Sequence, residues 1–169
     1  GHMHIRFRDV RVPAANMLLG PGRGFEIAQG RLGPGRIHHC MRAIGQAEKA
    51  LAAMCHRALD REAFGKPLAG FQVMRHKIVD MATQVEVSRE FTYRVAAKID
   101  AGLSQIKEIS MAKNFACSVS DKVTYDAVQI FGGYGLTREY PMEKLLRDTR
   151  ACLIADGCNE ILSLKGGTL

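Results

Sequence analysis

The 169-residue sequence contains no tryptophan, and aromatic residues amount to only 7% of it. It also lacks a run of about 20 apolar residues, which a membrane-spanning helix requires, so we expect no membrane span. The formal net charge is +7, but the Lys and Arg residues are scattered rather than clustered with aromatic side chains. Surfaces that bind nucleic acid usually show such clusters. The surplus charge therefore favours a phosphorylated small molecule over nucleic acid as the anionic partner.

Cysteine pairs at metal-binding spacing are absent as well. The five cysteines are odd in number and form no CxxC pair, so the sequence predicts neither a disulfide framework nor a zinc module. A reducing compartment is the expected setting. The run His38-His39-Cys40 has the residue types of a metal site, but neighbouring side chains on a helix diverge by about 100° and cannot converge on one ion. We interpret these residues as packing and solvent-exposed side chains, and we predict no metal site.

The first 24 residues carry a strand pattern. Gly1-His2-Met3 is typical of the remnant of a cleaved expression tag, and we leave it out of the fold prediction. Residues 5–12 alternate apolar and polar side chains and stop at Pro13, which predicts a half-buried strand. One strand cannot form a sheet, so its partners are expected upstream or in another chain. The loop GPGRG at Gly20–Gly24 has the spacing of neither nucleotide-binding fingerprint and is interpreted as a simple turn.

Beyond residue 24 the sequence predicts helices, because apolar residues recur at intervals of three and four. Gly33-Pro34-Gly35 should kink the first helix. The predicted helices are, in order, Phe25 to about Glu62, Phe71 to about Ala101, the residues from Gly102 to the FGGYG break, Pro141 to Arg150, and Cys158 onward. Their apolar stripes can be buried only against each other. The predicted fold class is therefore all-α, an antiparallel bundle of three long helices with shorter C-terminal helices, preceded by a single residual strand.

Five short motifs, taken together, resemble the C-terminal helical domain of acyl-CoA dehydrogenases. They are RxxFGxxLxxFQ (Arg61–Gln72), DMAT (Asp80–Thr83), AVQIFGGYG (Ala127–Gly135), RD (Arg147–Asp148) and ADGxxEI (Ala155–Ile161). The segment Phe7–Arg42 is most similar to the subgroup of family members ten and eleven. This resemblance implies a remnant of the family's central β domain at residues 4–24, after the tag remnant at 1–3, and a helical domain at 25–169.

The resemblance also implies a function, namely flavin-dependent α,β-dehydrogenation of an acyl-CoA thioester with FAD as cofactor. It implies a homodimer or homotetramer and an electron-accepting flavoprotein or oxygen as the acceptor. The 169 residues alone are expected to be nearly inactive, because part of the family's flavin site is lined by residues of another domain. Location is expected to be cytoplasmic in a bacterium and mitochondrial or peroxisomal in a eukaryote. The alternative hypothesis is a catalytically silent helical scaffold for oligomerisation.

The cofactor residues are carried over from the resemblance one by one. They are Arg61, Phe64, Gln72, Gln129, Gly133 and Cys158. Arginine supplies a permanently charged fork for phosphate, glutamine offers a donor and an acceptor, and glycine allows close approach. Without the resemblance, the simpler interpretations are a surface arginine, a capping glutamine and a glycine that ends a helix. Arg57, one turn before Arg61, is expected to be an exposed arginine with no role.

The catalytic base is expected at Asp156, in the position where most relatives carry glutamate. A branch of the family places its base on the first helix, but the matching residue here is Gly35, which cannot serve. Arg36 and Gly157 match positions beside the substrate. The aspartate is one methylene shorter than glutamate, which withdraws the carboxylate by roughly 1.5 Å. The alternative is that Asp156 only caps the helix that follows it.

Overall fold

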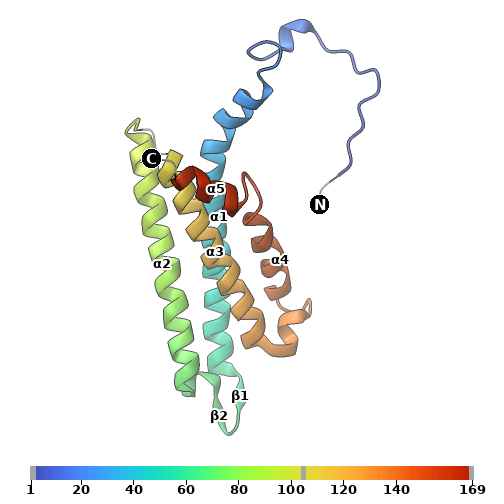
Figure 1. Ribbon diagram of the computed structural model, residues 1–169. Coiled ribbons are helices and arrows are strands. Elements are labelled where there is room, and N and C mark those ends of the chain that lie inside the picture. Colours follow the sequence, from blue (N-terminus) through green and yellow to red (C-terminus); the bar gives the residue numbers. More distant parts are fainter. Residues whose placement is uncertain (1–2, 104–105, 168–169) are drawn as a thin grey trace.

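The computed structural model describes residues 3–103 and 106–167. Gly1 and His2 of the predicted tag remnant, and the last two residues of the predicted helical domain, lie outside them. The described residues form five α-helices and one small hairpin (Figure 1). The elements are α1 (Gly24–Asp60), β1 (Glu62–Ala63), β2 (Lys66–Pro67), α2 (Gln72–Asp100), α3 (Ile106–Phe131), α4 (Met142–Cys152) and α5 (Asn159–Gly167), with 3-10 helices η1 (Ala14–Asn16), η2 (Leu68–Gly70) and η3 (Gly132–Leu136). The predicted all-α bundle of three long helices and shorter C-terminal helices is confirmed.

The predicted strand at residues 5–12 is wrong for the structure of this chain. The segment is extended and exposed on both faces, and it lies apart from the helices in Figure 1. A strand forms only where a neighbouring strand supplies hydrogen bonds. In the described residues, the sole strand pairing is the antiparallel hairpin of β1 and β2. The alternating pattern therefore has no sheet to join here.

Helix α3 lies in the middle of the bundle and packs against α1, α2, α4 and α5. Its contact with α1 is the most extensive of all. Both helices carry several small buried residues, namely Ala43, Ala47, Ala50 and Ala58 on α1 and Ala112, Ala116 and Ala127 on α3. The hydroxyl of Ser120 on α3 donates to the carbonyl oxygen of Ala43 on α1 at 2.8 Å. Small side chains let two helix axes approach closely, so α1 and α3 form a rigid central pair.

Larger apolar residues fill the space around this pair. Met54, Met81 and Met142 are fully buried and fill the core. A buried polar side-chain pair between α3 and α4 is satisfied internally, because Thr124 and Thr149 share a hydrogen bond of 2.8 Å. None of the helices in the described residues combines the length and apolarity needed to cross a lipid bilayer.

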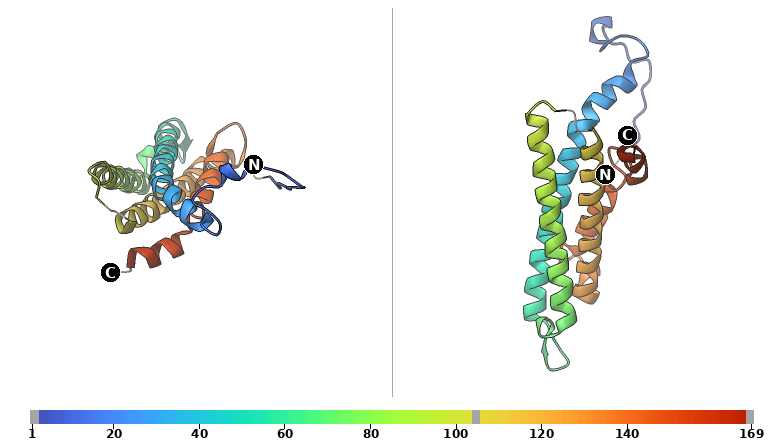
Figure 2. Two further views of the ribbon diagram at one scale, coloured as in Figure 1. Left: turned by 90° about the horizontal axis from the view of Figure 1, so that it is seen from above. Right: turned by 60° about the vertical axis from the view of Figure 1, so that its left-hand side comes forward.

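Pro34 lies inside α1, which continues through it. Proline lacks the N–H that would bond to the preceding turn, so the helix is expected to bend there. The first turns of α1 lean away from the bundle, while the rest of the helix runs along α3 (Figures 1 and 2). The bend brings Gly35 and Arg36, both buried, to the level of the turn between α4 and α5.

Gly135 provides a test of the packing at the end of α3. A Cβ atom at this position would lie 2.5 Å from the carbonyl oxygen of Val128, which is backbone and cannot swing away. Gly135→Ala should therefore lower the free energy of unfolding by about 1–3 kcal/mol. Gly133→Ala, two residues earlier with no atom within 4 Å of the added carbon, should change it by less than about 0.5 kcal/mol. Urea unfolding of the two variants, followed by circular dichroism, measures the difference, and equal stabilities would contradict the packing described here.

Candidate functional site

The structure divides the predicted site residues between the two ends of the bundle. At one end, where α1 and α3 finish and the hairpin turns, lie Arg61, Phe64, Gln72, Gln129 and Gly133. Toward the other end, on α1 and in the turn between α4 and α5, lie Arg36, Asp156, Gly157 and Cys158. Along α1, at 1.5 Å per residue, Arg36 and Arg61 are about 37 Å apart. Figure 1 shows the hairpin and α5 toward opposite ends of the bundle.

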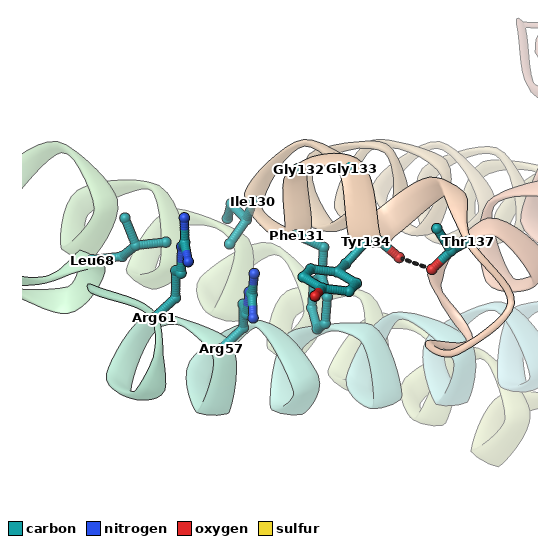
Figure 3. A pocket seen from close by; sticks show the side chains of 9 residues that line it. All are labelled: Arg57, Arg61, Leu68, Ile130, Phe131, Gly132, Gly133, Tyr134 and Thr137. Carbon is teal, nitrogen blue, oxygen red and sulfur yellow. Dashed lines mark hydrogen bonds between the residues drawn. The ribbon is translucent and has the colours of Figure 1, made fainter. Parts of the chain in front are cut away.

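A pocket of about 550 Å³ lies at the hairpin end, which we call the arginine pocket. It is lined by Arg57, Arg61, Leu68, Ile130, Phe131, Gly132, Gly133, Tyr134 and Thr137. The two arginine side chains extend from the end of α1 toward the residues that follow α3 (Figure 3). The structure thus brings Arg61 and Gly133 together, as the motifs predicted. Gln72 and Gln129 are exposed at the same end without lining this pocket.

Arg57 is a member of this pocket that sequence reasoning missed. It was expected to be exposed, but it is half-buried, and its guanidinium carbon lies 5.7 Å from the ring centre of Phe131 and 5.3 Å from that of Tyr134. These are cation–π distances. Its Nε atom is buried without a hydrogen-bond partner among the described residues. Arg57 precedes Arg61 by one helical turn, and this spacing places the two side chains on the same face.

The arginine pocket has the chemistry of an anion site. Two guanidinium groups that stay charged at any physiological pH converge on it, and Gly132 and Gly133 add no side chain that would close it. A buried, unpaired donor such as Nε of Arg57 costs about 1–3 kcal/mol until an acceptor reaches it. A ligand rich in acceptor oxygens, such as a phosphate ester, fits these residues.

Phe64 stands at the tip of the hairpin and is 97% exposed. Its φ angle is +52° and that of Gly65 is +80°, so the two residues form the tight turn that joins β1 to β2. A left-handed conformation is unfavourable for phenylalanine and is found mainly where function requires it. An aromatic side chain held out in solvent by a strained turn is available to a partner.

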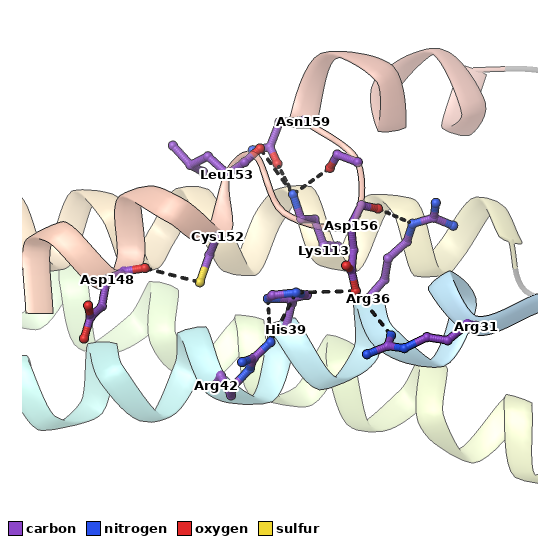
Figure 4. Close-up of polar contacts among 11 residues, drawn as sticks. Arg31, Arg36, His39, Arg42, Lys113, Asp148, Cys152, Leu153, Asp156 and Asn159 are labelled. Atoms are coloured by element: carbon purple, nitrogen blue, oxygen red, sulfur yellow. Dashed lines mark hydrogen bonds and ion pairs between the residues drawn. The ribbon is translucent and has the colours of Figure 1, made fainter. Parts of the chain in front are cut away.

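Asp156 lies in the turn between α4 and α5, and its carboxylate points toward α1 (Figure 4). Its Oδ2 atom is 3.4 Å from Nε2 of His39 and 3.7 Å from Nη1 of Arg31, and the side chain is 20% exposed. No hydrogen bond links this carboxylate to the start of α5 in the described part of the chain. The helix-cap alternative is therefore not what the structure contains. The carboxylate is presented at the bend of α1 instead.

Gly35 creates the space that this carboxylate occupies. A Cβ atom on Gly35 would lie 2.3 Å from Oδ2 of Asp156 and 2.3 Å from Nη1 of Arg31. Gly35 and Asp156, the two positions at which the resemblance implies a base, thus meet at the same point. A side chain at residue 35 would force the carboxylate of Asp156 and the guanidinium of Arg31 to move from these positions.

The turn itself is fixed from α1. Nε of Arg36, a residue only 5% exposed, donates to the backbone oxygen of Asp156 at 3.0 Å. Asp156 and Gly157 both have positive φ angles, +55° and +109°. Aspartate tolerates this conformation better than most residues, and glycine adopts it freely. Arg36 therefore lies beneath the predicted base, and Cys158 follows Gly157, half-buried at the end remote from the arginine pocket.

The histidine and cysteine residues of α1 point in different directions. His38 is exposed, His39 faces Asp156, and Cys40 is buried in the core, where burial raises the pKa of its thiol to about 12. Within the residues that the structure describes, no group of three or more His, Cys, Asp and Glu side chains is arranged to hold a metal ion.

The described residues form an antiparallel helical bundle that presents a carboxylate in the turn before its last helix. Comparison with known families is more specific. Residues 22–165 match the family model described as "Acyl-CoA dehydrogenase, C-terminal domain". The chain belongs to the acyl-CoA dehydrogenase family, as its C-terminal helical domain.

Individual relatives agree with this assignment. The chain is 46% identical over 163 residues to acyl-CoA dehydrogenase family member 11 of Gallus gallus, covering 95% of this chain and 21% of that protein. The structure of butyryl-CoA dehydrogenase from Megasphaera elsdenii superposes with a TM-score of 0.89 at 42% identity, covering 95% of this chain and 42% of that one. A structure from work on the electron transferring flavoprotein of Acidaminococcus fermentans gives a TM-score of 0.89 at 40% identity, over 95% of this chain and 42% of that one. The chain therefore spans less than half the length of these relatives.

The contact between Gly35 and Asp156 can be tested by substitution. Alanine is favoured over glycine inside helices by about 1 kcal/mol, so Gly45→Ala, at an exposed position of α1 with open space around it, should stabilise the chain. Gly35→Ala should gain less than Gly45→Ala, because the carboxylate of Asp156 and the guanidinium of Arg31 must both move to admit the added carbon. Free energies of unfolding in urea provide the comparison. If both variants are stabilised equally, the carboxylate does not lie over Gly35.

Proposed function

We propose that this domain is part of a flavin-dependent acyl-CoA dehydrogenase that forms a double bond between Cα and Cβ of an acyl-CoA thioester. The observation that carries the proposal is the carboxylate of Asp156, held in a strained turn directly over Gly35. Family membership and the butyryl-CoA dehydrogenase of M. elsdenii support the same reaction class. Chain length and branching of the acyl group are not part of the proposal.

In this mechanism Asp156 removes the α-proton of the thioester. The thioester carbonyl makes that proton acidic, and a fixed carboxylate lowers the barrier further by proximity. His39 and Arg31 lie within 4 Å of the carboxylate and orient it, while partial burial keeps most water away. FAD, when bound, supplies the acceptor for the hydride that leaves Cβ. The shorter side chain of aspartate is accommodated because Gly35 lets the turn pack closely on α1.

The arginine pocket is proposed to hold the diphosphate of FAD. Arg61 and Arg57 would pair with its oxygens, with Gly133 allowing close approach and Gln129, Gln72 and Phe64 adding contacts around it. The pocket lies about 37 Å from Arg36 along α1, farther than an extended dinucleotide spans. One chain therefore serves two flavins, with Asp156 beside its own and the arginine pocket on that of a neighbouring copy. Cys158, which lies beside the base, would contact the chain's own flavin.

A homodimer or homotetramer follows from this arrangement. Large apolar side chains are exposed on α2 and α3, among them Val79, Val87, Met111 and Phe115, and an apolar groove of about 710 Å³ runs between α2, α3 and α5. Contiguous exposed apolar surface is typical of subunit interfaces. An electron-transferring flavoprotein or oxygen is proposed as the acceptor that reoxidises the enzyme.

The alternative, a catalytically silent helical scaffold, also predicts self-association but requires no flavin and no base. The absorbance spectrum of the purified full-length protein separates the two, because bound oxidised flavin is visible directly. Turnover of an acyl-CoA then tests the chemistry.

Replacing the base tests the mechanism. Asp156→Asn in the full-length enzyme preserves the size of the side chain but cannot accept a proton, so turnover should fall by roughly 10²–10⁴-fold with flavin still bound. Asp100→Asn, at the exposed end of α2, should behave as the wild type. The assay is anaerobic bleaching of the flavin by acyl-CoA. Near-normal bleaching in Asp156→Asn would remove this residue from the chemistry.

The arginine pocket predicts a pair of flavin-retention variants. Arg61→Gln and Arg57→Gln should each weaken FAD binding, because a charge-assisted hydrogen bond contributes about 1.5–3 kcal/mol, which is tenfold or more in affinity. Arg94→Gln is the matched control, since Arg94 also lies over an aromatic ring, that of Phe91 at 5.1 Å, but far along α2. The measurement is the flavin-to-protein ratio after dialysis. Full retention in the Arg57 variant would show that its place in the pocket is only structural.

A further inference from the structure

Lys113, on α3, is fully buried beneath the turn that carries Asp156. Its Nζ atom donates to the backbone oxygens of Leu153 and Gly157, at 3.3 and 2.9 Å. It also donates to Oδ1 of Asn159, at 3.0 Å. These acceptors lie on both sides of Asp156 in the chain, and Figure 4 shows the ammonium group in the middle of the turn.

Burying an ammonium group in a protein core is energetically unfavourable. Removing it from water is unfavourable unless every N–H finds an acceptor, and Lys113 has three acceptors for its three donors. Burial lowers the pKa of Lys113. The backbone oxygen of Leu153 lies just past the last residue of α4, where helix carbonyls lack partners and the helix dipole is negative. The position thus suits a cation.

The turn needs this support because its backbone is strained. Asp156 at φ +55° is a left-handed non-glycine residue, and such residues persist only where the surroundings fix them. Lys113 holds the turn from α3, Arg36 holds it from α1, and the backbone N–H of Asn159 closes it onto Leu153 at 3.1 Å. In the part of the chain that the structure describes, the ion-pair partners of the carboxylate are Arg31 and His39, both on α1, so its position depends on how firmly the turn is held.

We propose that Lys113 is a positioning residue for the dehydrogenation: its ammonium group ties both sides of the Asp156 turn to α3 and so keeps the carboxylate over Gly35. This inference rests on the proposed function of Asp156 as the base. Lys113 touches neither the carboxylate nor the substrate position and acts through the backbone alone.

The test is Lys113→Met in the full-length enzyme, which keeps the length of the side chain and removes its donors. A misplacement of the base by about 1 Å costs roughly 100-fold in rate, so kcat should fall by about that factor while KM for acyl-CoA and the flavin content stay unchanged. A purely structural role would instead lower the stability and the flavin content, and it would not lower kcat while leaving KM unchanged. Lys122→Met is the control, because Lys122 is on the same helix but half-exposed and paired with Asp126.

A second variant keeps the inference testable if Lys113→Met does not fold. Asn159→Ala removes one of the three acceptors and leaves the lysine in place; kcat should fall by roughly tenfold, and amide hydrogen exchange in residues 153–159 should accelerate. Faster exchange with an unchanged kcat in either variant would overturn the positioning role. If the wild-type enzyme turns over no acyl-CoA, the proposed function fails, and hydrogen exchange still reports whether Lys113 holds the turn.

Discussion

The close contact between α1 and α3 is the constraint on which both ends of this domain depend. Alanine residues such as Ala47 and Ala116 bring the two helices together, and the hydroxyl of Ser120 joins them by a hydrogen bond to α1. At one end of this pair, α1 contributes Arg57 and Arg61 while α3 leads into the glycines that face them. At the other end, α1 and α3 supply the residues that hold the aspartate turn. One rigid helix pair therefore fixes two groups about 37 Å apart.

The aspartate turn combines local strain with a large number of fixed contacts. A left-handed aspartate costs of order 1–3 kcal/mol, and burying a lysine ammonium group costs more still unless all its donors are paired. In this chain the two costs are linked, because the carbonyl groups that the strained turn exposes are the acceptors that Lys113 requires. The carboxylate is then left to face Gly35 and His39 rather than the helix that follows it.

The Asp156 turn and the arginine pocket differ in whether their polar groups have partners within the chain. The turn is held entirely by contacts within the chain, whereas the arginine pocket contains a buried, unpaired donor on Arg57 and lies beside the exposed, strained Phe64. A buried donor without a protein partner leaves room for a ligand acceptor. The chain spans less than half the length of the relatives it matches.

The sequence by itself determined the helices, because apolar residues at intervals of three and four form one continuous face only in an α-helix. It also placed Arg61 and Gly133 in one site and Asp156 in the last turn, through motifs that resemble a known family. It marked residues 5–12 as strand-forming, but the described residues contain no strand that pairs with them, since alternation describes a potential to pair and not the presence of a partner. Tertiary structure alone decided the rest. Arg57 lines the pocket because the end of α3 brings Phe131 and Tyr134 close to its guanidinium group. Lys113 lies under the turn that carries Asp156, although 43 residues separate Lys113 from Asp156 in the chain. Periodicity marks which face of a helix is buried, but which side chains from distant segments meet there depends on how the helices pack.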